Sequence, residues 1–146
     1  MGYTHYWTSK EVSKEQFAEF VSVCKKLRGK LPKTTNTAGG YYLSDSVVIK
    51  GWDGTGKPQF DQKGVGFNGD AADDLDHETF LITPEPRDSF CKTARKPYDL
   101  LVTACLIAAY EILKYDVSSD GKMTDWKAAF DYYKEVTGVE SKLIIK

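Results

Sequence analysis

The alternation of apolar and polar residues predicts the first two elements of the chain. Residues 3–7 alternate polar and aromatic side chains, a pattern typical of a short β-strand. Ser13 and Gln16 have the spacing of a capping box, and apolar residues follow at helical spacing. These apolar residues are Phe17, Phe20, Val21, Cys24 and Leu27. We therefore expect an amphipathic helix that ends at the break formed by residues 29–32.

Short apolar runs separated by turn signals occupy the middle of the chain. Residues 47–52 predict one strand, residues 53–56 a turn and residues 60–67 a returning strand, so together they predict a β-hairpin. Residues 77–83 predict the next strand, which Pro84 and Pro86 end. Residues 34–40 and 68–76 read as loops.

Residues 90–113 join a basic stretch to the most apolar stretch of the sequence. From residue 100 to residue 113 the chain is apolar on every side, which is typical of a helix in the middle of a fold. Pro97 suits the first turn of a helix, so we expect this helix to begin near Lys96.

The remaining residues predict a short strand or connection at 115–119 and a last amphipathic helix. Thr124 or Asp125 caps this helix and Gly138 ends it. Residues 143–145 predict either an edge strand or a contact with a partner subunit. The order of elements predicts one α+β domain over residues 1–146. In this domain a buried central helix and two amphipathic helices pack on a mainly antiparallel sheet.

Composition bounds the function without defining it. The 146 residues are 41% hydrophobic and 28% charged, with a formal net charge of -1, which gives no general attraction to long nucleic acids or anionic membranes. Cys24, Cys91 and Cys105 show no CxxC spacing, so we expect buried free thiols in a reducing compartment. The sequence lacks a signal-peptide pattern and an apolar run of membrane-spanning length. We therefore expect a soluble cytoplasmic protein without a membrane partner.

Three cations, Lys92, Arg95 and Lys96, lie near the predicted start of the central helix. Cations are disfavoured at this end of a helix dipole and anions are favoured there. Two interpretations stay open for the anion that balances them. It is either internal, from Asp99 or the acidic run of residues 70–78, or it is a bound phosphate.

The sequence gives little support for a metal site or for a catalytic nucleophile. Acidic and imidazole side chains cluster in one stretch: Asp70, Asp73, Asp74, Asp76, His77 and Glu78. In a strand, however, His77 and Glu78 point to opposite faces. Residues 116–121 resemble the start of a calcium loop, but Lys127 occupies the position of its bidentate acid. Because the sequence has no GxSxG motif and no phosphate loop, we predict no catalytic residue, cofactor or metal.

A nucleotide-binding set remains. Tyr6, Trp7, Trp52 and Tyr98 are candidates for stacking on bases, and the basic residues for holding phosphates. Polar residues suited to base edges or ribose hydroxyls are Asn68, Ser118, Ser119 and Asp120.

Several sequence blocks resemble a family of short phage and bacterial proteins. The blocks are GYTHYW (residues 2–7), FNGD (67–70), HETF (77–80), FCKTARKPYD (90–99) and VSSDG (117–121), whereas residues 71–76 match no part of the pattern. The family is identified with phage anti-CBASS sponge proteins. The resemblance implies a homo-oligomer in the host cytoplasm that evades immunity by sequestering a cyclic dinucleotide without cleaving it.

The same resemblance implies that Lys92, Arg95 and Lys96 clamp phosphates while the GYTHYW and HETF blocks line the pocket. The full set of predicted ligand-binding residues is Thr4, His5, Tyr6, Trp7, Asn68, His77, Thr79, Lys92, Thr93, Arg95, Lys96, Tyr98, Ser118, Ser119 and Asp120. Two alternatives stay open. One is a metal-assisted nucleotide hydrolase that uses Asp76, His77 and Glu78, and the other is a protein-binding factor without a nucleotide ligand.

Overall fold

The computed structural model describes residues 2–32 and 47–146. Within them the chain forms three α-helices and six β-strands, all paired in antiparallel fashion, so the predicted α+β class is confirmed. The predicted loop at residues 34–40 lies outside the described residues.

The first sheet has the strand order β5-β1-β6. Its central strand β1 (Thr4–Thr8) lies between β5 (Ser89–Lys92) and β6 (Asp116–Ser119). The alternation at the start of the chain therefore predicted β1 correctly. β5 falls in the basic stretch, for which no strand was predicted.

The second sheet has the order β2-β3-β4 and corrects the predicted hairpin. Its strands are β2 (Gln59–Asp61), β3 (Gly64–Phe67) and β4 (Phe80–Ile82). The hairpin lies within residues 59–67, where the Asp61 carboxylate accepts the N–H groups of Lys63 and Gly64 and so forms the turn. The predicted strand at residues 77–83 shortens to β4.

Residues 47–52 do not form the predicted strand. Only Lys50 pairs, in an isolated bridge with Asn68. The following residues close on themselves instead, because Gly51 N–H donates to the Gly56 carbonyl and Gly54 N–H to the Gly51 carbonyl. The turn signal of residues 53–56 was therefore real, but it forms a closed loop with a 3-10 turn at Trp52–Gly54 rather than a hairpin connection.

Helix α2 (Asp99–Ala108) is buried along its whole length, as the apolar pattern predicted, and continues into a π-helical turn (Ala109–Leu113). It begins at Asp99 and not near Lys96. After Ala94 and Arg95, whose φ values of 52° and 58° are left-handed, residues 96–98 form a separate turn in which the Asp99 N–H donates to the Lys96 carbonyl. A carboxylate thus occupies the first turn, where the helix dipole favours it.

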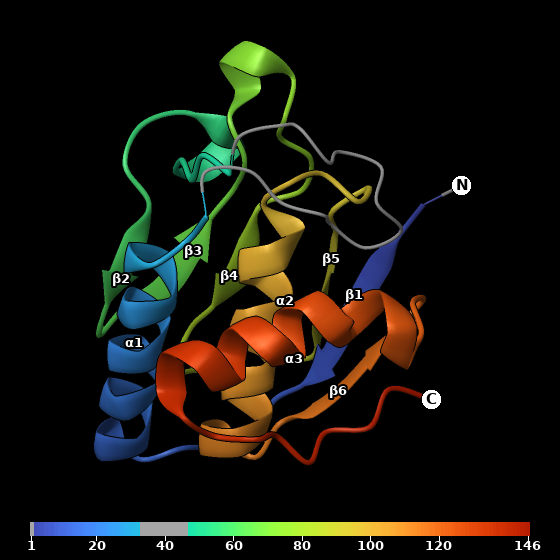
Figure 1. Cartoon of the computed structure of the whole chain (residues 1–146). Helices are drawn as coiled ribbons and strands as arrows, with labels where there is room; N and C mark the ends of the chain where they lie inside the picture. Colours follow the sequence, from blue (N-terminus) through green and yellow to red (C-terminus); the bar gives the residue numbers. More distant parts are fainter. Residues whose placement is uncertain (1, 33–46) are drawn as a thin grey trace.

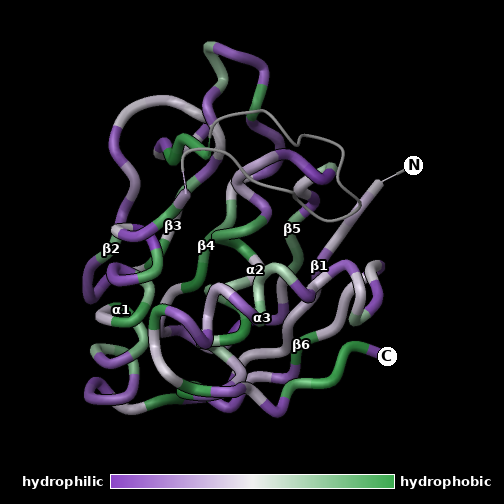
Figure 2. The backbone as a smooth tube through the Cα atoms, in the orientation of Figure 1, coloured by the Kyte–Doolittle hydropathy of each residue, from purple (hydrophilic) through white to green (hydrophobic). Residues whose placement is uncertain are grey.

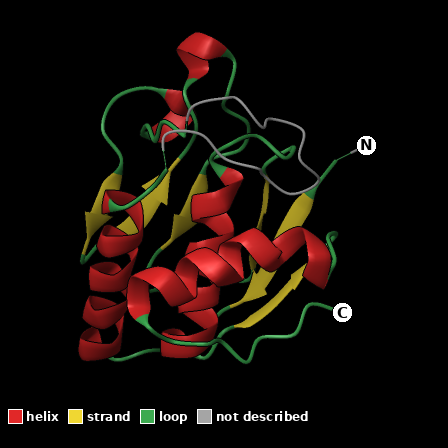
Figure 3. Ribbon diagram, in the orientation of Figure 1, coloured by secondary structure: helices red, strands yellow, loops and turns green. Residues whose placement is uncertain are grey.

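The two amphipathic helices are α1 (Lys14–Gly29) and α3 (Met123–Thr137). The Ser13 and Gln16 capping box of α1 is present. Lys122 caps α3, two residues before Thr124 and three before Asp125, the two predicted caps, because the Asp125 carboxylate accepts the backbone N–H of Lys122. All three helices lie on one side of the strands, and α3 crosses α2 (Figures 1 and 3).

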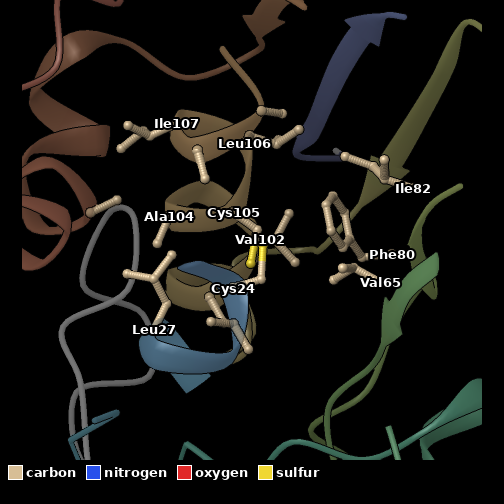
Figure 4. Close-up of a cluster of buried hydrophobic side chains, with 14 of the residues drawn as sticks. Cys24, Leu27, Val65, Phe80, Ile82, Val102, Ala104, Cys105, Leu106 and Ile107 are labelled. Atoms are coloured by element: carbon tan, nitrogen blue, oxygen red, sulfur yellow. The ribbon is translucent and has the colours of Figure 1, made fainter. Parts of the chain in front are cut away.

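One core joins these layers. Leu106 and Val102 of α2 lie near Phe80 and Ile82, whereas Ala104 lies toward Leu27 of α1 (Figure 4). All three cysteines are free and buried, as predicted. Hydrophilic residues follow the loops and the outer turns of α1 and α3 (Figure 2).

The C-terminal segment packs on its own domain and does not form the predicted edge strand. Leu143 and Ile145 enter the core while Ile144 stays 61% exposed.

Candidate functional site

Three of the sequence blocks that carry the family resemblance, at residues 2–7, 90–99 and 117–121, meet on the first sheet, whereas residues 67–70 and 77–80 belong to the second sheet and its loop. In the register of the first sheet His5 lies opposite both Cys91 and Ser119, and Tyr6 lies opposite both Phe90 and Ser118. Because neighbouring residues of a strand point to opposite faces, this register divides the predicted site into two sets. The His5 row faces the helices, and the Tyr6 row faces away from them.

The inner set is a buried hydrogen-bond network around His5. The Nε2 atom of His5 lies 2.6 Å from Oδ1 of Asp99, and Nδ1 lies 2.8 Å from Oγ of Ser119. Thr93 Oγ1 donates to the same Asp99 oxygen at 2.6 Å. His5, Thr93 and Asp99 are all buried, so this network links β1, β6 and the start of α2 inside the core.

Aromatic rings cover the network. The rings of Tyr3 and Trp126 lie edge-on to the His5 ring, with centroids 4.9 and 5.1 Å away. A hydroxyl, an imidazole and a carboxylate in line have the composition of a hydrolytic triad. Here, however, His5 is 0% exposed and the Ser119 hydroxyl oxygen accepts the N–H of Gly121 at 2.9 Å. The geometry is that of a structural network.

The three predicted phosphate ligands do not form one cluster. Arg95 lies over the Tyr3 ring at 4.0 Å and 3.6 Å from the Asp125 carboxylate of α3. Lys96 Nζ donates to the Asp74 carbonyl at 2.6 Å, so the acidic run supplies a partner for this cation. Asp99, the other internal candidate, is engaged by His5 and Thr93 instead.

Lys92 belongs to a different surface from Arg95 and Lys96. It is exposed at the end of β5, and its backbone is held by Glu78, whose N–H donates to the Lys92 carbonyl at 3.1 Å. In the register Lys92 lies opposite Thr4 and two residues from Phe90, on the face that points away from the helices.

The outer set forms an aromatic platform, by which we mean Tyr6 and Phe90. These residues are 40% and 54% exposed, and their ring centroids lie 6.5 Å apart. The Tyr6 hydroxyl donates to Asp120 Oδ1 at 3.0 Å, and this hydrogen bond raises the pKa of Tyr6. Asp120 also accepts the N–H of Thr4, which ties the platform to the end of β6.

A hollow of about 360 Å³ adjoins the platform on the side away from Lys92. The platform rings form part of its wall together with Asp88, Asp116 and Ser118. Trp7 also lines the hollow, but its ring is buried in the core, with its centroid 5.3 Å from that of Phe80. Phe90, which is not among the predicted site residues, is one of the residues that line the hollow.

Asn68 and His77 are not among the residues that line the hollow, whereas Thr79 lines a small cleft that also borders Phe90. The Asn68 side chain donates to the His77 carbonyl and to Thr79 Oγ1, and accepts the N–H groups of Gly69 and His77. Its hydrogen-bonding capacity is therefore used to shape a loop. Tyr98 is buried as well and donates to the Glu78 carbonyl, so it belongs to the core.

No three His, Cys, Asp or Glu side chains gather as metal ligands within residues 2–32 and 47–146. Asp76, His77 and Glu78 accordingly do not form such a group.

Comparisons of the chain with protein-family models, curated proteins and solved structures find no match. The family resemblance therefore stays a prediction. None of the helices that the structure describes is long and apolar enough to cross a membrane.

Proposed function

We propose that this protein binds a small nucleotide, specifically a cyclic dinucleotide, on the outer face of the β5-β1-β6 sheet and sequesters it without cleavage. The observation that carries this proposal is the exposed pair Tyr6 and Phe90 in adjacent strands. Two large aromatic rings side by side on an open sheet face are the arrangement on which nucleic-acid bases stack.

The energetics of stacking favour a nucleotide over an aliphatic ligand. Each base on an aromatic side chain contributes about 1–3 kcal/mol, and every base has a suitable π-face. The hydrogen bond from Tyr6 to Asp120 holds one ring in place before a ligand arrives. Less side-chain entropy is then lost on binding.

The polar groups around the platform are placed to orient a bound nucleotide. Lys92 lies on one side of the Tyr6 and Phe90 row and is suited to a phosphate. Asp116 and Ser118 lie on the side of the hollow, and a carboxylate there accepts hydrogen bonds from base amino groups. We expect bases that carry an amino group to bind best.

Sequestration is favoured over cleavage by the chemistry of the hollow. Its described lining contains aromatic rings, hydroxyls and the carboxylates of Asp88 and Asp116, without an imidazole or a thiol. A cyclic dinucleotide also carries two bases. Two copies of the chain offer a platform for each, so a homo-oligomer forms part of the proposal.

Isothermal titration with cyclic dinucleotides that carry adenine or guanine tests the assignment. We expect Phe90→Ala and Tyr6→Ala each to weaken binding about tenfold or more, since one stacking contact is worth about 1–3 kcal/mol. Trp52→Ala is the matched control. Trp52 is exposed to a similar extent (52%), but it lies beside Gly66 of β3, in the other sheet. Equal affinity of all three variants and the wild type would overturn the platform. A folded wild type that binds no nucleotide would favour a protein-binding factor.

A further inference from the structure

A second cavity separates the two sheets. Strands β4 and β5 are joined by residues 83–88, but within the described ladders β4 pairs with β3 and β5 with β1. Glu78 and Lys92 hold the two segments together at one end, where Glu78 N–H donates to the Lys92 carbonyl and Lys92 N–H to Glu78 Oε1. Beyond this point a cleft of about 70 Å³ lies beside Ile82, Ser89 and Phe90.

Tyr115 is one of the residues that line this cleft, and its hydroxyl is unsatisfied. The residue is 0% exposed, and its hydroxyl is buried without a hydrogen-bond partner. Burial raises the pKa of Tyr115, so the hydroxyl keeps its proton and is a donor at neutral pH. A buried hydroxyl without a partner is unfavourable, and an acceptor that reaches it from the cleft would satisfy it.

The other polar lining is rich in donors. Thr83 and Ser89 contribute hydroxyls, Arg87 lines the cleft from the loop, and Glu85 is the one carboxylate among the described lining residues. Ser9 fixes the Arg87 backbone, because its hydroxyl donates to the Arg87 carbonyl and accepts the Arg87 N–H. Hydroxyls and a guanidinium are the groups that bind phosphate oxygens.

The cleft and the hollow of the platform share walls, namely Trp7, Ser89 and Phe90. We infer that the cleft binds a phosphate group of the nucleotide whose base stacks on Phe90, with Tyr115 and Arg87 as donors. This inference rests on the proposed function. It places one phosphate in the cleft, and the exposed Lys92 at the end of β5 is suited to the other phosphate of a ligand with two.

The test compares ligands with and without phosphate. We expect Arg87→Gln and Tyr115→Phe each to weaken binding of a cyclic dinucleotide and of a nucleoside monophosphate about tenfold, while the affinity for the matching nucleoside stays within twofold. Glu85→Gln removes the nearby negative charge and is expected to tighten the phosphate-bearing ligands. Tyr115→Phe should leave the melting temperature equal or higher, because it removes an unsatisfied hydroxyl, so lost binding is not lost folding.

Inorganic phosphate separates failure of this inference from failure of the proposed function. If the nucleoside and nucleotide bind but Arg87→Gln and Tyr115→Phe leave both affinities unchanged, the cleft assignment is wrong while the platform stands. If the wild type binds no nucleoside or nucleotide, the proposed function is wrong. Inorganic phosphate then tests the cleft assignment on its own. A rise in melting temperature with phosphate at constant ionic strength, abolished by Arg87→Gln, supports a phosphate site in the cleft. No rise overturns that assignment.

Discussion

The carboxylate of Asp99 and the imidazole of His5 form a buried pair, with 2.6 Å between Oδ1 and Nε2, that connects the first turn of α2 to the central strand of the first sheet. Thr93 donates to the same oxygen, so Asp99 bonds both a residue six positions before it and a residue 94 positions before it. The pair fixes the inner face of β1. Because Tyr6 follows His5, it also fixes which residues of β1 face outward.

Loss of the Asp99 carboxylate should destabilise the fold strongly. Asp99→Ala leaves His5 and Thr93 buried without their acceptor, and removal of one member of such a pair costs about 3–5 kcal/mol. Urea unfolding followed by circular dichroism measures the change, with the exposed Asp73→Ala as control. A loss below about 1 kcal/mol would show that the network does not hold the sheet to α2.

Asn68 should act on stability rather than through a ligand. Asn68→Asp replaces the amide N–H groups that bond the His77 carbonyl and Thr79 with a carboxylate oxygen. We expect a loss of about 1–3 kcal/mol in the free energy of unfolding. His77→Gln, an exposed change in the same loop, should have little effect. Equal stability of the two variants would contradict the structural role of Asn68.

The sequence pattern predicted correctly those helices and strands that depend on nearby residues or that are buried on every side. The capping box and apolar spacing fixed α1, and the unbroken apolar run marked α2 as central. The start of α2 was placed three residues too early, because residues 96–98 form a turn that follows the left-handed Ala94 and Arg95. Neither alanine nor arginine signals a left-handed conformation in a sequence, so the turn was not expected.

The candidate site was predicted only in part. Strand alternation placed Tyr6 and His5 on opposite faces, but the sequence did not show which face the helices cover. That choice depends on the pairing of His5 with Asp99, which lie 94 residues apart. Phe90 was missed because it was read as part of the basic stretch that leads into the central helix, although in β5 it alternates with the buried Cys91.

Truncation of Lys92 should lower ligand affinity, whereas truncation of Arg95 should lower stability. Lys92→Ala removes a cation from the outer face and should weaken binding of a cyclic dinucleotide several-fold. Arg95→Ala removes the contacts to Tyr3 and Asp125, and should lower stability by about 1 kcal/mol while affinity stays within about twofold. Titration and thermal unfolding of both variants measure these effects. The reverse result would move the phosphate site to the start of α2.

Stability should fall at alkaline pH. Burial raises the pKa of Tyr133 to about 12, above its ordinary value of 10.0, so the folded state keeps a proton that the unfolded state loses. The stabilisation is complete below pH 10 and is lost as the pH rises through 12. Urea unfolding at several pH values between 9 and 12 should show a shallower decline for Tyr133→Phe. An unchanged decline would contradict this assignment.

Equilibrium dialysis against a labelled cyclic dinucleotide with Mg²⁺, followed by chromatography of the released ligand, tests sequestration on the aromatic platform most directly. We expect the wild type to retain the ligand, Phe90→Ala to release most of it, and the ligand recovered from the wild type to be intact. Equal retention of the ligand by Phe90→Ala would contradict binding on the aromatic platform, and recovery of a linear product would contradict sequestration without cleavage.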